Sequence, residues 1–362
     1  MKLSRKPVFA VGLLFFCLVI HIYSSRESRV ETGYSNGFFV YFSRFLRTLF
    51  GWLPISLGDI LYGLLIAWLG WKIGRFIIQV FKKQPRISRR ALYKTAIYNS
   101  LVFCCSIYIV FNVFWGINYD RKGIAAQLGL QMQSYTANDL VAINRVLIEK
   151  INASKSQWQT GQTTYPSNRQ LFTMVSGAYK TIAIEYPFLK YEPASFKSSM
   201  WGWLGNYTGF TGYYNPFTGE AQLNTTIPRF LQPFVACHEV GHQLGYAKEN
   251  EANFVGYLAA ANSNNTLFQY AAYLDMFTYA NRNLQFTDST RAKELRKMLA
   301  PAVLADIKEW IEFNRRHRSF VEPVISWVYG KYLQGNRQPG GILSYDEVTG
   351  FIIAYYKKFG RI

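Results

Sequence analysis

The stretch LQPFVACHEVGHQLGYAKENEANF, residues 231–254, places two of the chain's four histidines four positions apart, with a glutamate beside the first. On an α-helix, residues four apart lie one above the other on the same face, so His238 and His242 can direct their imidazoles at one metal ion. Glu239 lies about 100° around the helix, beside such an ion rather than on it. A carboxylate placed there can take a proton from metal-activated water. The spacing therefore predicts a Zn²⁺-binding helix with Glu239 as the catalytic base.

The residues around this motif fit a buried helix with defined ends. Pro233 is typical of a first helical turn, and Gly245 is typical of the residue that follows a helix. Residues 234–237 carry no charge. We interpret Cys237 as a small packed residue rather than a ligand, because it is the only cysteine in residues 118–362.

A catalytic zinc site has three protein ligands and leaves the fourth position for water or substrate. Downstream of the histidines, the candidates for the third ligand are Glu249 and Glu251. A second helix starting near Glu249 would place Asn253 on the same face, where its amide can orient a metal-bound histidine. Glu251 would then face roughly the opposite side. We therefore expect Glu249 to be the third ligand, with Glu251 as the alternative.

Three apolar segments precede this soluble portion. They cover about residues 7–25, 56–81 and 95–117, and each is long enough to cross a bilayer core of roughly 30 Å. The second begins with the capping-box pattern Ser56-x-x-Asp59. Residues 1–117 are therefore predicted to form a membrane domain with three transmembrane helices.

The basic residues predict the orientation of these helices. Residues 82–94, KKQPRISRRALYK, join the second and third segments and contain no acid, which places them in the cytoplasm by the positive-inside rule. Residues 118–362 are then extracytoplasmic, attached to the outer face of the cytoplasmic (inner) membrane with the lipid bilayer as a partner. Residues 38–50 in the outer loop are interpreted as an interfacial amphipathic helix or, alternatively, as a continuation of the second span.

The net charge of +19 does not indicate nucleic acid as a partner. Residues 1–118 contain 15 Lys and Arg against 3 Asp and Glu, whereas residues 119–362 contain 25 against 18. Most of the excess positive charge thus lies beside the apolar segments, where it is typical of membrane topology and of attraction to anionic lipid.

The pattern beyond residue 118 predicts a mostly helical α+β domain with a small sheet. Two core helices are indicated by apolar residues at helical spacing, namely Leu140, Ile143, Leu147 and Ile151, and Leu171, Val175, Tyr179 and Ile182. Residues 186–227 are rich in Gly, Thr and aromatics, which favours short strands. Further helices are expected near 265–284, 289–317 and 344–358, the last opened by Ser344-x-x-Glu347.

At the HEVGH motif the sequence resembles the gluzincin-type metallopeptidases, whose downstream glutamate motif is similar to residues 249–253, ENEAN. More closely, it resembles an uncharacterised bacterial family of membrane-anchored HExxH proteins, a domain of unknown function. The similar blocks are FGWLPISLGDILYG, WGINYDRKGIAAQLGL, GYYNPFTGEAQLNTTIPRF and HEVGHQLGYAKENEANF. The resemblance implies a zincin-like fold and peptidase activity, with His238 and His242 as zinc ligands and Glu239 as base.

A metzincin-like pattern, HExxHxxG, also overlaps the motif, but the next ligand would fall at Lys248, which cannot bind metal while protonated. In zincins an extended strand before the active-site helix aligns the substrate, and PFTGEAQLN occupies that place. Tyr213 and Tyr214 are candidates to stabilise an oxyanion or contact substrate, with packing as the alternative. Glu220 belongs either to the cleft or to a structural turn.

Two functions remain open from the sequence. The leading one is a zinc-dependent peptidase tethered to the membrane, with an unspecified peptide or protein substrate. The alternative is a catalytically silent binding or assembly protein that keeps a structural zinc. An intramembrane protease is disfavoured by the charged residues around the motif, and a transporter by the single acid, Asp59, within the apolar segments.

Overall fold

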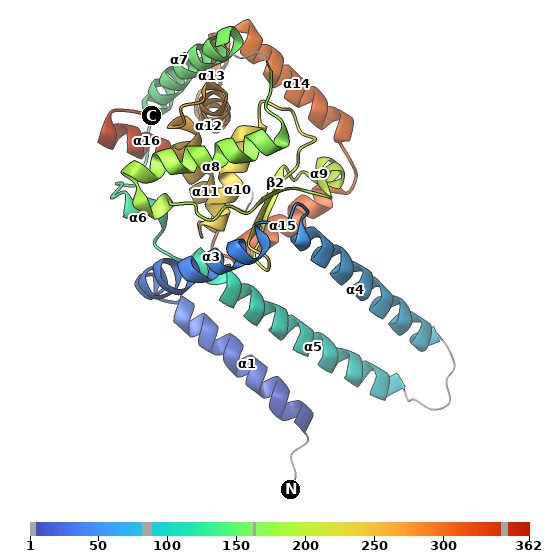
Figure 1. Ribbon diagram of the computed structural model, residues 1–362. Helices are drawn as coiled ribbons and strands as arrows, with labels where there is room; N and C mark the ends of the chain where they lie inside the picture. Colours follow the sequence, from blue (N-terminus) through green and yellow to red (C-terminus); the bar gives the residue numbers. More distant parts are fainter. Residues whose placement is uncertain (1–4, 82–88, 162–163, 342–346) are drawn as a thin grey trace.

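The computed structural model describes residues 5–81, 89–161, 164–341 and 347–362. Three long helices extend from one end of a mostly helical domain (Figure 1). The elements of the N-terminal part are α1 (Arg5–Ser24), α2 (Glu27–Arg29), the π-helix η1 (Val30–Phe38), α3 (Phe39–Phe50), α4 (Leu57–Phe81) and α5 (Arg89–Phe114).

The domain contains a small sheet and many helices. After the 3₁₀ turn η2 (Gly116–Asp120) come α6 (Gly123–Gln127), α7 (Ala137–Gly161), α8 (Asn168–Glu185), η3 (Pro187–Leu189), β1 (Phe196–Ser198), α9 (Gly202–Thr208), β2 (Gly212–Asn215) and β3 (Glu220–Leu223). The remaining elements are α10 (Gln232–Gln243), α11 (Glu249–Ala261), α12 (Thr266–Thr287), α13 (Ser289–Arg296), α14 (Pro301–His317), α15 (Glu322–Gly335) and α16 (Val348–Phe359).

Three of the described helices are long and apolar enough to cross a membrane, at Lys6–Ser24, Leu57–Phe81 and Arg90–Phe114. They correspond to the three predicted spans. The third one ends three residues earlier than expected, because Trp115 leaves helical geometry and η2 follows. The side chains of these helices are almost entirely exposed within the chain, which is expected of surfaces that face lipid.

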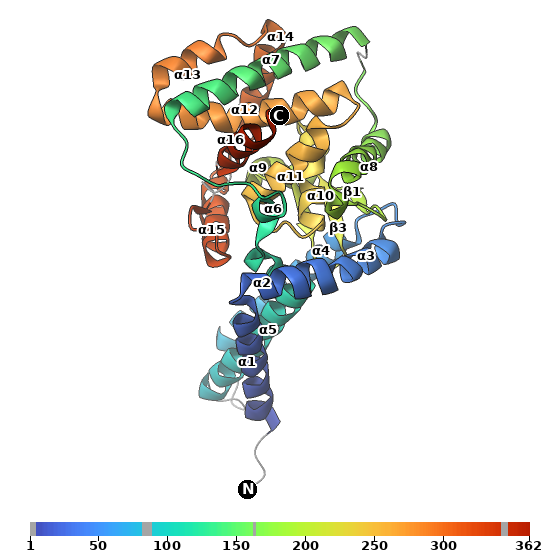
Figure 2. The same cartoon turned by 90° about the vertical axis from the view of Figure 1, so that its left-hand side faces the viewer.

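Residues 38–50 do not continue the second span, so that alternative is wrong. α3 is a separate helix that ends at Phe50, and six residues separate it from α4. With η1 it lies across the domain-side ends of the spans (Figure 2). Its buried residues, Phe39, Ser43, Leu46 and Arg47, share one face, and Phe39 and Leu46 pack against the domain at Gly245 and Gly219. The segment between the first two spans is therefore part of the folded domain.

The N-terminus of α4 is fixed to the sheet by two carboxylates. Glu220 on β3 accepts hydrogen bonds from the backbone N–H groups of Leu57 (3.2 Å) and Gly58 (2.7 Å), which the first turn of a helix leaves unpaired. Ser56 caps Asp59 N–H at 3.1 Å as the sequence predicts. The Asp59 carboxylate does not complete the capping box, however, because it accepts from Met200 N–H (2.7 Å) instead. We call this arrangement the α4 clamp.

The sheet has three strands in the order β1-β3-β2. β1 pairs with β3 in parallel, with Phe196 opposite Ala221, and β2 pairs with β3 antiparallel, with Tyr213 opposite Gln222. The predicted small strand region is thus confirmed. β3, within the expected substrate-aligning segment, is paired on both sides and cannot accept another strand. The edge strand nearer the HEVGH helix is β2.

The main core lies where α7, α8, α11 and α12 meet. All eight core positions predicted on α7 and α8 are at most 2% exposed. The single helix expected over 289–317 is wrong: it is two helices, α13 and α14, because Pro301 lacks an N–H and starts a new helix. The cap expected at Ser344 falls outside the described residues, and α16 begins at Val348.

Candidate metal centre

The HEVGH motif lies on α10, which is buried along most of its length. Pro233 occupies its first turn, and Gly245 follows its end with a φ of +89°, a conformation that glycine adopts without strain. His238 and His242 stand on successive turns, with ring centroids 4.6 Å apart. The helix start and end therefore agree with the sequence prediction.

α11 approaches α10 closely through two glycines. A Cβ placed on Gly256 would lie 2.8 Å from the backbone nitrogen of His238, and one on Gly241 would lie 3.2 Å from the carbonyl oxygen of Ala252. Larger residues at these positions would force the two backbones apart. The close packing brings Glu249, the first residue of α11, over the two imidazoles.

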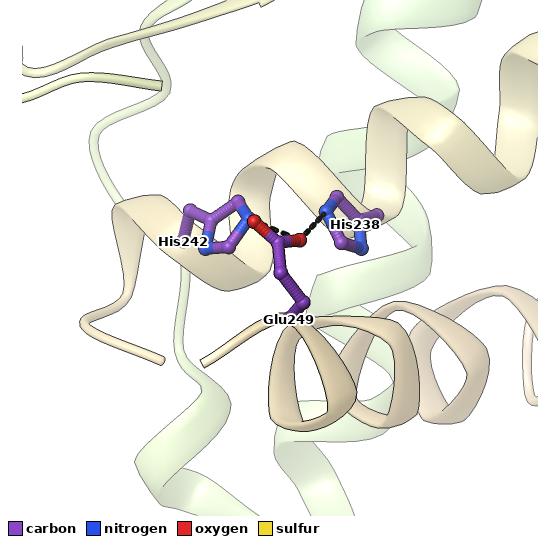
Figure 3. Close-up of side chains that lie close together, drawn as sticks. All are labelled: His238, His242 and Glu249. Atoms are coloured by element: carbon purple, nitrogen blue, oxygen red, sulfur yellow. Dashed lines mark ion pairs between the residues drawn. The ribbon is translucent and has the colours of Figure 1, made fainter. Parts of the chain in front are cut away.

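The three side chains converge on one point (Figure 3). Glu249 Oε2 lies 3.3 Å from His238 Nε2 and 3.4 Å from His242 Nε2. Two ligand atoms bound tetrahedrally to zinc at about 2.0–2.1 Å lie roughly 3.3 Å apart, so the spacing fits such an ion. This group of His238, His242 and Glu249 could hold a metal ion, and its two imidazoles and one carboxylate are a donor set that suits zinc.

Neighbouring groups fix the orientation of both imidazoles. His242 Nδ1 lies 2.8 Å from the carbonyl oxygen of Tyr246, which accepts the Nδ1 proton and leaves Nε2 free for a metal. Trp115 Nε1 donates to the carbonyl oxygen of His242 at 3.0 Å, and its ring meets the His242 ring edge-on. Asn253 is a hydrogen-bond partner of His238, as predicted for a residue one turn after Glu249 on the same face.

The electrostatics of the group are dominated by burial and by the Glu249 charge. Burial lowers the pKa of His238, which favours the neutral imidazole that metal binding needs. Burial alone would also lower the pKa of His242, but the Glu249 carboxylate raises it to about 9. Although burial opposes it, the two imidazoles hold the pKa of Glu249 well below its usual range. The carboxylate is therefore ionised and directed at both nitrogens.

Glu239 lies beside the group rather than in it. It contacts Gly212 on β2 so closely that a Cβ there would come within 2.6 Å of its Oε1. Its Oε2 is buried and has no hydrogen-bond partner among the described residues. Burial raises the pKa of Glu239 to about 8, and a divalent cation next to it would lower that value. The side chain is thus placed to exchange a proton with a molecule bound at the centre.

These residues line a cavity of about 250 Å³. Its wall is built from β2, α10, α11, α12, α15 and the segment that follows α5, including Trp115, Phe210, Glu239, Asp275 and Tyr332. The three grouped side chains thus line a shared cavity with Glu239.

Comparison with known proteins identifies the family. The family model described as "Protein of unknown function (DUF3810)" matches residues 34–353. The chain belongs to the DUF3810 family. No curated protein and no solved structure matches it. The matched region begins within η1 and includes α3, two of the three apolar helices and the whole of the metal centre.

Other residues predicted at this DUF3810 site lie elsewhere. Glu251 is not in the group; its carboxylate packs against Gly123, where a Cβ would meet Oε1 at 1.8 Å. Lys248 is the residue before α11 and is not in the group either. Glu220 belongs to the α4 clamp, which makes it structural. Cys237 is fully buried, as expected of a packed residue.

Tyr213 and Tyr214 on β2 were predicted to contact an oxyanion. Both residues line the cavity, but their hydroxyl groups have other contacts. Tyr213 donates to Asp59 at 2.5 Å and shares a hydrogen bond with Ser199. The Tyr214 ring packs against Trp115, and its hydroxyl is buried with no hydrogen-bond partner among the described residues. The Tyr213 hydroxyl is thus engaged by Asp59 and Ser199, and the Tyr214 ring is packed.

The sequence did not indicate the contribution of α15. Tyr329 donates to Glu249 Oε1 at 2.5 Å, which positions the carboxylate so that Oε2 points at the histidines. Tyr332 lines the cavity and shares a hydrogen bond with Tyr119. α15 follows Glu249 by more than 70 residues, and no spacing rule connects them. Trp115 lay inside the predicted third span, 95–117, and only the earlier end of α5 in the structure places it at the metal centre.

Proposed function

We propose that this DUF3810 protein is a zinc-dependent peptidase attached to the outer face of the cytoplasmic membrane. The observation that supports the proposal most is the placement of Glu239 beside His238, His242 and Glu249 within one cavity. Two imidazoles and one carboxylate leave the fourth position of a tetrahedral zinc ion open, which is the arrangement of catalytic rather than structural sites.

When bound, zinc supplies a Lewis acid for the scissile carbonyl and increases the acidity of water. The residues of the chain perform the remaining steps. Glu239 takes a proton from water and passes it to the leaving amine. Within the described residues β2 is an edge strand, and an extended substrate can pair with its free edge beside Glu239.

The alternative is a silent protein with a structural zinc. A structural site is closed by four protein ligands, and in the described part of the chain only three side chains form the group. The cavity next to them, with an unpartnered carboxylate oxygen on Glu239, favours catalysis.

The test uses the full-length protein in detergent. We expect the wild type to bind one zinc ion and to cleave peptides in an unbiased library, whereas Glu239→Gln keeps the zinc and loses about 10²–10⁴-fold in turnover, as loss of a general base predicts. Glu251→Gln is the matched control, because it changes a buried glutamate outside the group, and it should keep both properties. Full turnover in Glu239→Gln would refute the mechanism, and loss of zinc only in Glu251→Gln would refute the ligand assignment.

The outer-face placement rests on the basic segment 82–94 and needs its own measurement. A protease that cannot cross the cytoplasmic membrane is added to cells whose outer envelope layers have been removed. It should digest a tag fused after Ile362. Protection of that tag, with digestion of one inserted in residues 82–94, would reverse the proposed orientation.

A further inference from the structure

A large apolar surface on the domain has no covering element among the described residues. It is formed by α9 and by α15 with the loop before it, and we call it the α9–α15 patch. Phe320 is 90% exposed, Trp327 65%, Val324 60% and Trp203 59%. The two helices contact each other, and Ser319 Oγ donates to the carbonyl oxygen of Tyr207. A continuous apolar surface of this kind is typical of an interaction site rather than of a water-exposed face.

α15 has two faces with different surroundings. Val321, Val324, Trp327 and Val328 follow one another at helical spacing and are all exposed. The opposite face carries Tyr329, which reaches into the metal centre. One helix therefore connects the outer apolar stripe to a ligand of the proposed zinc ion. α15 therefore packs one face on the domain and leaves an apolar face uncovered within the described residues.

The patch adjoins two of the three spans. Trp201, just before α9, donates from Nε1 to the carbonyl oxygen of Asp59, and its ring lies against Gly63 on α4. On the other side, the Tyr332 ring of α15 packs against Phe111 of α5, with centroids 6.3 Å apart. Figures 1 and 2 place α15 at the end of the domain nearer the spans. The apolar surface of the spans thus continues onto the domain.

Positive charge borders the patch. Arg315, Arg316 and Arg318 precede Phe320 and are exposed, as is Lys331 on α15. Aromatic and apolar side chains flanked by Arg and Lys are typical of surfaces that enter the headgroup region of a membrane containing anionic lipid. The positive charge and the apolar side chains therefore both indicate a lipid bilayer as the partner of this patch.

We propose that the α9–α15 patch is embedded in the leaflet from which the domain emerges, so that the cavity opens at the bilayer surface and receives membrane-anchored polypeptides. The substrate part of this inference rests on the proposed peptidase function. Trp115, which touches His242, directly follows the last residue of the third span. Since an extended chain advances about 3.3 Å per residue, cleavage falls within a few residues of the bilayer. The substrate class is the juxtamembrane segment of a lipid- or helix-anchored protein.

Embedding is tested without any activity measurement. In a full-length chain whose four cysteines are replaced by alanine, a fluorophore is placed at Trp327→Cys or, as the matched control, at Phe286→Cys. Phe286 is 80% exposed and belongs to the last turn of α12, a helix that Figures 1 and 2 place on the side of the domain away from the spans. Each protein is reconstituted into vesicles of phosphatidylcholine and phosphatidylglycerol, with or without bromine on the phosphatidylcholine chains near the headgroup.

We expect brominated lipid to remove roughly half of the emission at position 327, because interfacial helices lie about 5–10 Å deep, and to leave position 286 unchanged. Equal quenching at both positions would overturn the proposal. So would an absence of quenching at position 327. A disulfide between the unlabelled 327 cysteines of two copies would then show that a second copy covers the patch.

The substrate class is tested with one peptide sequence in two forms, free in solution or carrying two acyl chains, on the same vesicles. The anchored form should be cleaved at least about tenfold more efficiently because it is confined near the cavity. Phe320→Glu with Trp327→Glu should abolish that advantage and leave cleavage of the free peptide unchanged. Equal cleavage of both forms by the wild type would refute the substrate class. If zinc-loaded protein cleaves neither form of the peptide, the peptidase function is refuted. The quenching experiment would still decide whether the patch is embedded in the bilayer.

Discussion

The ion pair between Glu31 and Arg121 connects the segment after the first span to the end of α10, and removing it should destabilise the domain strongly. Arg121 meets both carboxylate oxygens of Glu31, at 3.1 and 2.8 Å, and donates to the carbonyl oxygen of Gly245 at 3.2 Å. Glu31 also accepts from Lys122 N–H and Gln127. The side chains are only 2% (Arg121) and 10% (Glu31) exposed.

The change Glu31→Gln keeps the shape but leaves the guanidinium buried beside a neutral amide. Breaking a buried pair by removing one partner costs about 3–5 kcal/mol in free energy of unfolding. For a domain of this size each kcal/mol shifts Tm by roughly 2–4 °C, so the expected drop is about 6–20 °C. Replacing both residues with apolar ones of similar volume should restore much of the loss, because no unpaired charge remains.

The assay is thermal unfolding of the purified full-length protein in detergent. Glu312→Gln is the matched control: its partner Lys308 is 78% exposed, and the loss of such a pair costs only about 0.3–0.5 kcal/mol. Although burial alone would raise it, Arg121 holds the pKa of Glu31 below its ordinary value. Its contribution is therefore present above the pKa of an unfolded glutamate, about 4.3, and is lost as pH falls below that. A Tm drop in Glu31→Gln no larger than in the control would refute the reasoning.

Three further outcomes are expected. Tyr329→Phe removes the hydrogen bond to Glu249 and should weaken zinc binding about 10–100-fold in competition with a chelator; an unchanged affinity would show that the bond does not position the ligand. Gly212→Ala should lower peptide turnover about 10²-fold with zinc content unchanged, since its Cβ displaces Glu239; wild-type turnover would contradict this close contact. Burial raises the pKa of Asp275 to about 7, so its ionisation destabilises the folded state increasingly from about pH 4 to 7. Asp275→Asn should therefore gain up to about 4 kcal/mol relative to wild type in denaturant unfolding at pH 8 and nothing at pH 4, and a gain independent of pH would contradict the assignment.

The histidine pair and Glu249 could be predicted because each depends on local geometry. His238 and His242 are one helical turn apart, which any regular helix places on one face. The third member of the group required only that α11 begin at Glu249, and the structure has that start, with Lys248 extended before it. Asn253 followed from the same helix face. Local periodicity also fixed the core positions of α7 and α8.

Contacts between distant parts of the chain could not be predicted in this way. Glu31 and Arg121 are separated by 90 residues, and Tyr329 and Glu249 by 80. The sequence pattern predicted that the Asp59 carboxylate completes the capping box of α4. In the structure it accepts a hydrogen bond from Met200 N–H instead, and nothing in the sequence indicates that contact. Pro301 was a visible signal for the break between α13 and α14, since proline is typical of a first helical turn. Predicting the sheet order would also have required knowing that β1 pairs with β3. The sequences of such short strands do not indicate which strands pair.

The α4 clamp has a consequence for the order of assembly during synthesis. Leu57 and Gly58 are made and inserted well before Glu220 exists, because more than 160 residues separate them. Until then their N–H groups are hydrated at the aqueous end of the helix, so insertion does not depend on the later partner. Closing such a long loop is slow, which makes docking of the strand onto α4 a late event in biogenesis. A ribosome-bound chain that ends before residue 220 would contain all three apolar helices, with α4 not yet docked onto β3.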